Sequence, residues 1–217
     1  MTLKLIIGNK NYSSWSLRPW IAMKVAGIAF EEELVPLYES EFKSTLLKHS
    51  PAGQVPILID GDVRVWETLA ILEYLADKFP AAALWPSDIK ARAHARTVAA
   101  EMHSGFAPLR KHCPLNVRRT PNPRPTMPAD VVANVKRIDA LWTDCRARFG
   151  NDGPYLFGRF TAADAMYAPV ISRFESYAID VSAPARAYMD AMRALTAWKE
   201  WKTASIEEPW VLAHVEF

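Results

Sequence analysis

The pattern of hydrophobic and polar residues changes character near residue 80. Before that point, segments with strand-like alternation and segments with helical spacing follow one another. The first is a strand-like run with Leu3, Leu5 and Ile7 that ends at Gly8. In chain order the pattern predicts that strand, a helix over 20–26, an extended segment over 30–37, a short helix over 41–48, strands over 55–59 and 63–66, and a helix over 67–78.

The turn between the last two strands indicates how the predicted sheet is connected. Asp60 and Gly61 separate two apolar runs, and an Asp-Gly pair in that position is a strong β-hairpin signal. The earlier order of strand, helix and strand favours a parallel crossover. The N-terminal part is therefore predicted to be an α/β unit with a mixed sheet.

The chain after Asp88 shows helical patterns and no convincing strand. These patterns cover about 89–111, 129–149, 162–178, 183–195 and 197–206. Five prolines fall within 114–128, which excludes a helix interior there. The segment 79–86, with two prolines, is typical of a partly packed linker. We therefore predict two domains, an α/β domain over 1–79 and an all-helical domain over 88–217.

Composition and charge exclude several classes of partner. The chain has 217 residues, of which 50% are hydrophobic and 23% charged, as in ordinary soluble proteins. The chain has 26 Lys and Arg and 24 Asp and Glu, so its net charge is +2. A net charge this small gives no reason to expect nucleic acid or an anionic membrane as a binding partner. The first eight residues lack a signal-peptide pattern, and no apolar stretch reaches the roughly 18 residues of a membrane span. We expect a cytoplasmic protein.

The cysteines give no sign of sulfur or metal chemistry within the chain. Cys113 and Cys145 lie far apart and no CxxC motif occurs. This arrangement excludes a disulfide framework, a Cys-rich zinc site and a dithiol redox centre. We expect no metal.

Hydroxyl groups cluster between the first predicted strand and helix, in Asn11-Tyr12-Ser13-Ser14-Trp15-Ser16. At a helix N-terminus such hydroxyls lie beside unpaired backbone N–H groups and the positive end of the helix dipole, where an anion such as a thiolate is stabilised. The alternative interpretation is simple N-capping, for which serine is a favoured residue.

Two further motifs lie in the same half of the chain. In Gln54-Val55-Pro56, a proline that opens an edge strand can be cis and expose free backbone groups to an extended peptide, although most such prolines are trans. Glu67 and Thr68 open a predicted helix, where a carboxylate ligand meets a hydroxyl and backbone N–H groups and an ammonium meets Glu67. A capping pair is the alternative interpretation.

The first predicted helix of the second half carries a possible ligand-facing surface. Met102, Phe106 and Arg110 are spaced four apart, so a continuous helix over 89–111 places them on one face, with His103 beside them. The alternatives are helix packing for Met102 and Phe106 and a salt bridge for Arg110.

Taken in order, these motifs resemble the glutathione transferase family. The stretch Ser13-Ser14-Trp15-Ser16-Leu17-Arg18 looks most like the serine-type, zeta-like bacterial members, and Gly158-Arg159-Phe160-Thr161-Ala162-Ala163-Asp164 is similar to the family's capping box. The resemblance covers nearly the whole chain. It implies a thioredoxin-like N-terminal domain that holds glutathione and an all-α C-terminal domain that shapes the pocket for the second substrate.

The resemblance also implies roles for individual residues. Ser13 is expected to donate a hydrogen bond to the glutathione thiolate, with Ser14 as the second choice and Tyr12 as the third. Gln54, Val55 and a cis Pro56 are expected to hold the cysteinyl unit, and Glu67 and Thr68 the γ-glutamyl end. The residues expected around the second substrate are Trp15, Met102, His103, Phe106 and Arg110.

The expected activity is conjugation of glutathione, as co-substrate, to a small electrophile by a homodimeric enzyme. A glutathione-dependent isomerase of the maleylacetoacetate type is the first alternative, and Trp15 counts against it because zeta members carry a cysteine there. A non-catalytic binding protein with the same fold is the second alternative. The intact serine, Gln54-Val55-Pro56 and Glu67-Thr68 motifs count against it.

Overall fold

The computed structural model describes residues 2–37 and 39–216, except for the side chain of residue 214. Its N-terminal part contains β1 (Leu3–Ile7), α1 (Ser14–Val25), β2 (Phe30–Leu34), α2 (Phe42–Leu47), β3 (Ile57–Asp60), β4 (Val63–Trp66), α3 (Thr68–Lys78) and the 3-10 turn η1 (Pro80–Ala82). Helices follow: α4 (Ile89–Ser104), α5 (Ala107–His112), α6 (Ala129–Phe149), α7 (Ala162–Ser176), α8 (Ala183–Ala194), α9 (Thr196–Glu207) and the turn η2 (Ala213–Val215).

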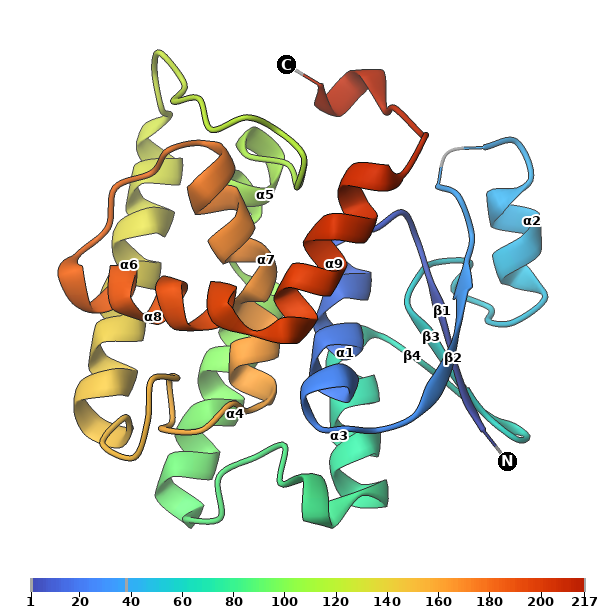
Figure 1. Cartoon of the computed structure of the whole chain (residues 1–217), viewed down its shortest axis with the longest axis horizontal. Helices are drawn as coiled ribbons and strands as arrows, with labels where there is room; N and C mark the ends of the chain where they lie inside the picture. The colour runs from blue at the N-terminus through green and yellow to red at the C-terminus, as the bar shows by residue number, and fades with distance from the viewer. Residues whose placement is uncertain (1, 38, 217) are drawn as a thin grey trace.

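The sheet has the mixed topology that the sequence predicts. Within the described residues its order is β2-β1-β3-β4, with β1 parallel to β2 and antiparallel to β3, and β3 paired with β4 in a hairpin. Gly61 adopts a φ of +59° in the hairpin turn, a conformation that glycine adopts without steric penalty. Helices α1 and α3 lie between the sheet and the C-terminal helices, whereas α2 lies on the other side (Figure 1).

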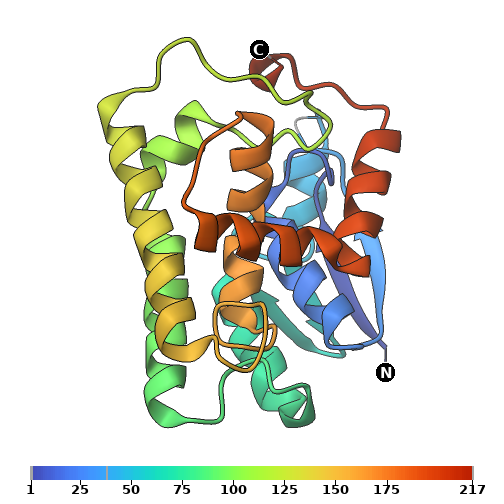
Figure 2. The ribbon, with the colours of Figure 1, turned by 60° about the vertical axis from the view of Figure 1, so that its left-hand side comes forward.

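Helix α7 is the centre of the helical part and joins it to the N-terminal part (Figure 2). It packs on α1 and on α4, and nearly all of its side chains are buried. Its first turn has the predicted capping box: Asp164 accepts from the N–H of Thr161 at 2.7 Å, and its other oxygen accepts from the N–H of Leu156 at 3.0 Å. Burial raises the pKa of Asp164 to about 6.

The helix predicted over 89–111 is interrupted, and this corrects the sequence analysis. Helix α4 ends at Ser104, Phe106 takes a left-handed φ of +57°, and α5 begins at Ala107. Pro108 explains the break, because its ring would clash with the carbonyl of residue 104 in a continuous helix. Met102, Phe106 and Arg110 therefore do not share one helical face.

Helix α1 begins at Ser14, six residues before the predicted start at 20, even though Pro19 lies inside it. Proline has no N–H and cannot donate to the carbonyl of Trp15. The Thr68 hydroxyl donates to that carbonyl instead, at 3.0 Å. A contact between distant residues thus accommodates a proline that the local sequence marks as a helix boundary.

Candidate active site

Two adjoining cavities lie where the β1–α1 turn, the loop before β3, and helices α3 and α4 meet. The larger, of about 440 Å³, is lined at one end by Tyr12, Ser13 and Ser14. The smaller, of about 200 Å³, reaches Glu67, Thr68 and His103. The two cavities share the lining residues Trp15, Ala52, Gln54 and Val55. The structure thus brings the three predicted N-terminal motifs together.

Ser13 and Ser14 are buried at the start of α1 and line the larger cavity. Ser13 is the N-cap residue, but its side chain makes no capping hydrogen bond. Its Oγ lies 2.8 Å from the Oγ of Ser16, which is fully buried and also accepts from the N–H of Gly8 at 3.1 Å. The geometry therefore does not support N-capping as the role of the Ser13 hydroxyl.

The Tyr12 hydroxyl is committed to a different set of partners. It accepts from the N–H of Leu212 at 3.2 Å and from the Arg118 guanidinium at 2.5 Å, and it is hydrogen bonded to Glu216. All three partners belong to the C-terminal half of the chain. The C-terminal half thus occupies the Tyr12 hydroxyl, although Tyr12 also lines the larger cavity.

The loop before β3 has the predicted backbone geometry. The Val55–Pro56 peptide bond is cis. Gln54 and Val55 line both cavities and Pro56 lines the smaller one. The edge of this loop therefore faces the space in which a peptide-like ligand would lie.

Glu67 and Thr68 differ in how they face the smaller cavity. Glu67 is exposed, makes no capping hydrogen bond, and takes a φ of +68° that is strained for a residue with a side chain. Its carboxylate lies 3.7 Å from Nε2 of His103. The Thr68 hydroxyl donates to Trp15, so its predicted bond to a ligand carboxylate is corrected. The Thr68 N–H remains, as one of the first N–H groups of α3 without a partner in the helix.

Only two of the five residues predicted around the second substrate line these cavities. Trp15 and His103 do so, with their rings edge to face at 5.4 Å. Met102, on α4, and Phe106, in the break before α5, are instead buried in the hydrophobic core. Arg110 is half-buried, with its guanidinium carbon 5.6 Å from the Trp15 ring centre.

Trp15 is held by cations as well as by His103. The guanidinium carbon of Arg18 lies 4.1 Å from the Trp15 ring centre, within cation–π range. Arg18 is fully buried, and burial, followed by the charges of Arg173 and Arg110, lowers its pKa. Arg18 donates to the carbonyls of Ser14 and Met166, both at 2.9 Å. These contacts give the indole a fixed position beside the serines.

Several residues of the two cavities belong to no motif in the sequence. Trp66, at the end of β4, lines the smaller one, and Lys43 on α2 lines the larger one together with Leu37 and Phe42. Lys43 lies in a weak helical pattern and carries no motif of its own. Its place in the same cavity as the serines comes from the packing of α2 and was not visible in the local sequence.

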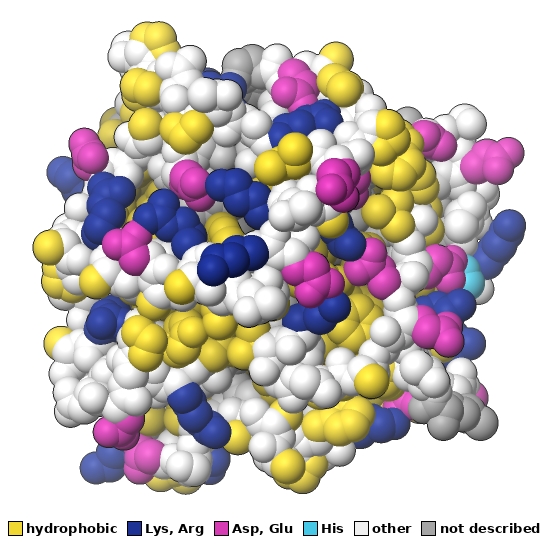
Figure 3. Space-filling view, in the orientation of Figure 1, with side chains coloured by type: hydrophobic (Ala, Val, Ile, Leu, Met, Phe, Trp, Pro, Cys, Tyr) yellow, Lys and Arg dark blue, Asp and Glu magenta, His cyan; other side chains and the backbone are white. Residues whose placement is uncertain are grey.

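The molecular surface carries both charge types. Lys and Arg side chains are interspersed with Asp and Glu over the face seen in Figure 3, in line with the small net charge. None of the helices among the described residues is long and apolar enough to cross a membrane. In the same part of the chain, no group of three or more His, Cys, Asp or Glu side chains is placed to hold a metal ion.

The fold and the two cavities define a two-part protein in which a thioredoxin-like unit and an all-α unit meet at a ligand cleft. Family models agree with this architecture. The model for the glutathione S-transferase N-terminal domain matches residues 12–78, and the model for the C-terminal domain matches residues 91–201. The chain belongs to the glutathione S-transferase family.

Individual relatives show how far the similarity extends. A glutathione S-transferase 1 from Dianthus caryophyllus is 35% identical over 116 residues, which are 53% of this chain and 52% of the relative. The chain thus matches about half the length of this relative. A maleylacetoacetate isomerase from Rattus norvegicus is 31% identical over 175 residues, 78% of each chain. The structure of a Burkholderia glutathione transferase homologue with bound glutathione matches with a TM-score of 0.73 at 22% identity, covering 96% of this chain and all of the other.

Proposed function

We propose that this protein is a glutathione-dependent enzyme that transfers the glutathione thiolate to a small electrophile. The observation that carries the proposal is the position of Ser13, whose hydroxyl lies at the N-terminus of α1, lines a cavity and makes no capping bond. A thiolate placed there would be near both a hydroxyl donor and the positive end of the α1 dipole.

The lining of the cleft supplies partners for each polar end of glutathione. The backbone of Val55, with Gln54 beside it, would pair with the cysteinyl unit next to the cis Pro56. Glu67 would hold the γ-glutamyl ammonium, and the N–H of Thr68 its carboxylate. Lys43, which also lines the larger cavity, would supply a positive charge to the glycyl carboxylate.

Ser16 explains how Ser13 can spare its proton for the thiolate. In the structure the Ser16 hydroxyl accepts from the N–H of Gly8 and from the Ser13 hydroxyl, so neither bond uses its own proton. When Ser13 donates to the thiolate, Ser16 would donate to Ser13. A chain of donors of this kind strengthens the terminal bond.

The free energies involved are of the right size. A free thiol has a pKa of about 8.5, and lowering it by about 2 units takes roughly 2.7 kcal/mol. A charge-assisted hydrogen bond contributes about 1.5 to 3 kcal/mol, and the helix dipole up to about 1 kcal/mol. Ser13 and α1 together are therefore sufficient.

The electrophile would lie against Trp15 and His103 on the helical side of the cleft. The indole replaces the cysteine of zeta-type members, which favours conjugation over isomerisation. The domain limits of 1–79 and 88–217, the homodimer and the cytoplasmic location are part of this proposal.

Retention on glutathione-agarose followed by a chlorodinitrobenzene conjugation assay tests the proposal. We expect retention that free glutathione competes, and turnover that requires free glutathione. Retention without turnover, together with isomerisation of a maleyl substrate, would replace transferase by isomerase activity. Absence of retention would contradict both activities.

A further inference from the structure

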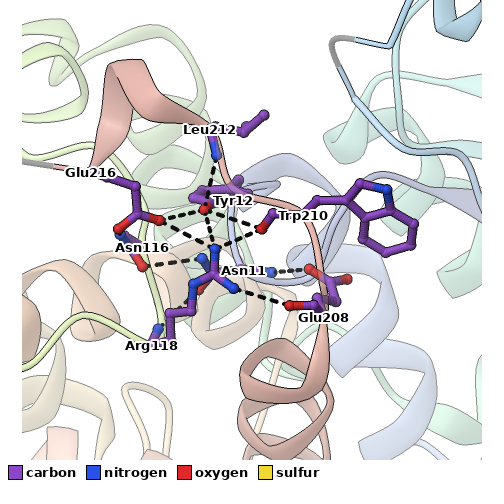
Figure 4. A network of polar contacts seen from close by, with 8 residues as sticks. All are labelled: Asn11, Tyr12, Asn116, Arg118, Glu208, Trp210, Leu212 and Glu216. Carbon is purple, nitrogen blue, oxygen red and sulfur yellow. Dashed lines mark hydrogen bonds and ion pairs between the residues drawn. The ribbon is translucent and has the colours of Figure 1, made fainter.

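The C-terminal segment 208–216 returns to the turn that precedes Ser13 (Figure 4). The contact begins directly after α9, where the buried carboxylate of Glu208 faces two backbone N–H groups. One oxygen accepts from Lys10 at 2.6 Å and the other from Asn11 at 3.0 Å. A residue nearly two hundred positions away thus satisfies two neighbouring donors of the β1–α1 turn.

The backbone carbonyls of the same two residues are also bound from the C-terminal half. The indole N–H of Trp201 donates to the Lys10 carbonyl at 3.0 Å, and the N–H of Val117 donates to the Asn11 carbonyl at 3.2 Å. The side chain of Asn11 bonds to Asn116 at 3.1 Å. The backbone N–H and C=O groups of both Lys10 and Asn11 are therefore hydrogen bonded to the C-terminal half of the chain.

Arg118 connects Glu208 with the rest of this segment. Its guanidinium donates to the carbonyl of Glu208 at 3.0 Å and to the carbonyl of Trp210 at 2.6 Å. The same group contacts the Tyr12 hydroxyl, so the charge of Arg118 lies close to the turn. Burial raises the pKa of Glu208, and the N–H groups of Asn11 and Lys10 and the charges of Lys10 and Arg118 oppose this shift.

The anchored residues set the geometry of the active-site serine. Immediately after Asn11, the N–H groups of Tyr12 and Ser13 both donate to the carbonyl of Asn9, at 3.1 and 2.8 Å. The peptide planes fixed by Glu208 therefore determine where the chain enters α1 and how Ser13 faces the cavity. A shift of a few tenths of an ångström in this turn is large relative to the geometry of a thiolate hydrogen bond.

From these contacts we infer that Glu208 is a positioning residue for thiolate formation, acting through the backbone of Lys10 and Asn11 on the Ser13 hydroxyl. The inference rests on the proposed function of Ser13. Both carboxylate oxygens are needed, since two N–H donors face them. Glutamine would turn an NH₂ group toward one of those donors and lose the bond.

The test compares Glu208→Gln with Glu200→Gln, an exposed carboxylate on the preceding helix α9 that pairs with Lys24. The pKa of the bound glutathione thiol is read from thiolate absorbance across pH, and kcat and KM come from the conjugation assay. We expect Glu208→Gln to raise the thiol pKa by about one unit and to lower kcat about tenfold below that pKa, with KM for glutathione within about twofold. Glu200→Gln should match the unmodified protein.

A lower melting temperature of Glu208→Gln with unchanged thiol pKa and kcat would overturn the inference and leave Glu208 a purely structural role. If Glu208→Gln does not fold, Glu208→Asp decides by the same measurements, because it keeps the charge but cannot span both N–H groups. If Ser13→Ala left the pKa of the bound glutathione thiol unchanged, the role proposed for Ser13 would be contradicted. In that case a drop in kcat for the Glu208 variant still shows that the turn is positioned from the C-terminal segment, and an unchanged kcat overturns the inference.

Discussion

The hydroxyl of Thr68, at the start of α3, donates a hydrogen bond to the carbonyl oxygen of Trp15 in α1 at 3.0 Å. This carbonyl has no helical donor, because the residue four positions later is Pro19. The bond joins the helix that carries the serines to the helix that would hold the γ-glutamyl end. Because Pro19 leaves the Trp15 carbonyl free for Thr68, it contributes to the position of α1 relative to α3.

Thr68→Val should lower the stability of the N-terminal part. Valine has nearly the shape of threonine but leaves the Trp15 carbonyl without its donor, which costs about 1 to 3 kcal/mol. Chemical denaturation should show a lower midpoint for Thr68→Val and a near-normal one for Thr68→Ser. Thr97→Val is the control, since Thr97 bonds within its own exposed helical turn. Equal midpoints for the two valine variants would show that the bond has no stabilising role.

Ser16→Ala should weaken thiolate formation even though Ser16 does not line the cavities. In the structure the Ser13 hydroxyl donates to Ser16 at 2.8 Å, and the variant removes the hydroxyl that would donate back to Ser13 once Ser13 turns to the thiolate. We expect the pKa of the bound thiol to rise by about half a unit to one unit and kcat to fall several-fold near neutral pH. Ser44→Ala, which removes an exposed hydroxyl near the cleft, should leave both values unchanged. A normal thiol pKa in Ser16→Ala would exclude the donor chain.

Glu67→Gln should weaken glutathione binding more than it affects turnover. The substitution removes the negative charge proposed to face the γ-glutamyl ammonium, and such a contact is worth about 1.5 kcal/mol or more, or about tenfold in affinity. KM for glutathione should rise by about that factor, with kcat within about twofold. Glu73→Gln on the same helix is the matched control, because Glu73 pairs with Arg96 on the surface. If Glu67→Gln raised KM no more than Glu73→Gln, the γ-glutamyl assignment would be wrong.

Asp164 should make stability depend on pH. Burial raises its pKa to about 6 from an ordinary 3.8, so between these values the folded state holds a proton that the unfolded state has released. This group therefore stabilises the fold fully below about pH 4, and that contribution is lost as pH rises through about 6.

Replacement by Asn isolates the effect of Asp164 on the pH dependence. The free energy of unfolding of the native protein minus that of Asp164→Asn should decrease between pH 4 and pH 6 by about 3 kcal/mol, at the 1.36 kcal/mol that each pKa unit represents. Denaturation curves at several pH values measure this difference. A difference that stays constant with pH would contradict the raised pKa.

The sequence predicted the order of elements well where local signals agree with tertiary packing. Helix α6 has the predicted limits of 129–149, and the hairpin turn falls at Asp60 and Gly61 as expected. The cis Val55–Pro56 bond and the Thr161–Asp164 capping box were also predicted and are confirmed. Short stretches of residues contain the physical cause of the hairpin turn and the capping box, whereas the cis bond was expected from the family resemblance, since the local residues allowed cis and trans.

The wrong predictions concern helix limits near two prolines. At Pro19 the outcome depends on a distant hydrogen-bond donor, and at Pro108 the predicted helix ignored the proline. Pro19 lies inside α1, where Thr68 supplies the donor that proline lacks, whereas Pro108 breaks the helix predicted over 89–111, so that Met102, Phe106 and Arg110 do not share one face. Lys43 and Glu208 reach the site only through packing of separate elements, so no local motif marks them.

The most direct test of the proposed chemistry is the pKa of the glutathione thiol bound to the native protein and to Ser13→Ala. It is measured as thiolate absorbance across pH, with glutathione affinity determined in parallel. We predict a thiol pKa about 2 units below the free value of about 8.5 in the native protein, and a value close to the free thiol in Ser13→Ala with affinity nearly unchanged. A Ser13→Ala variant that binds glutathione and keeps the lowered pKa would contradict the central role of Ser13.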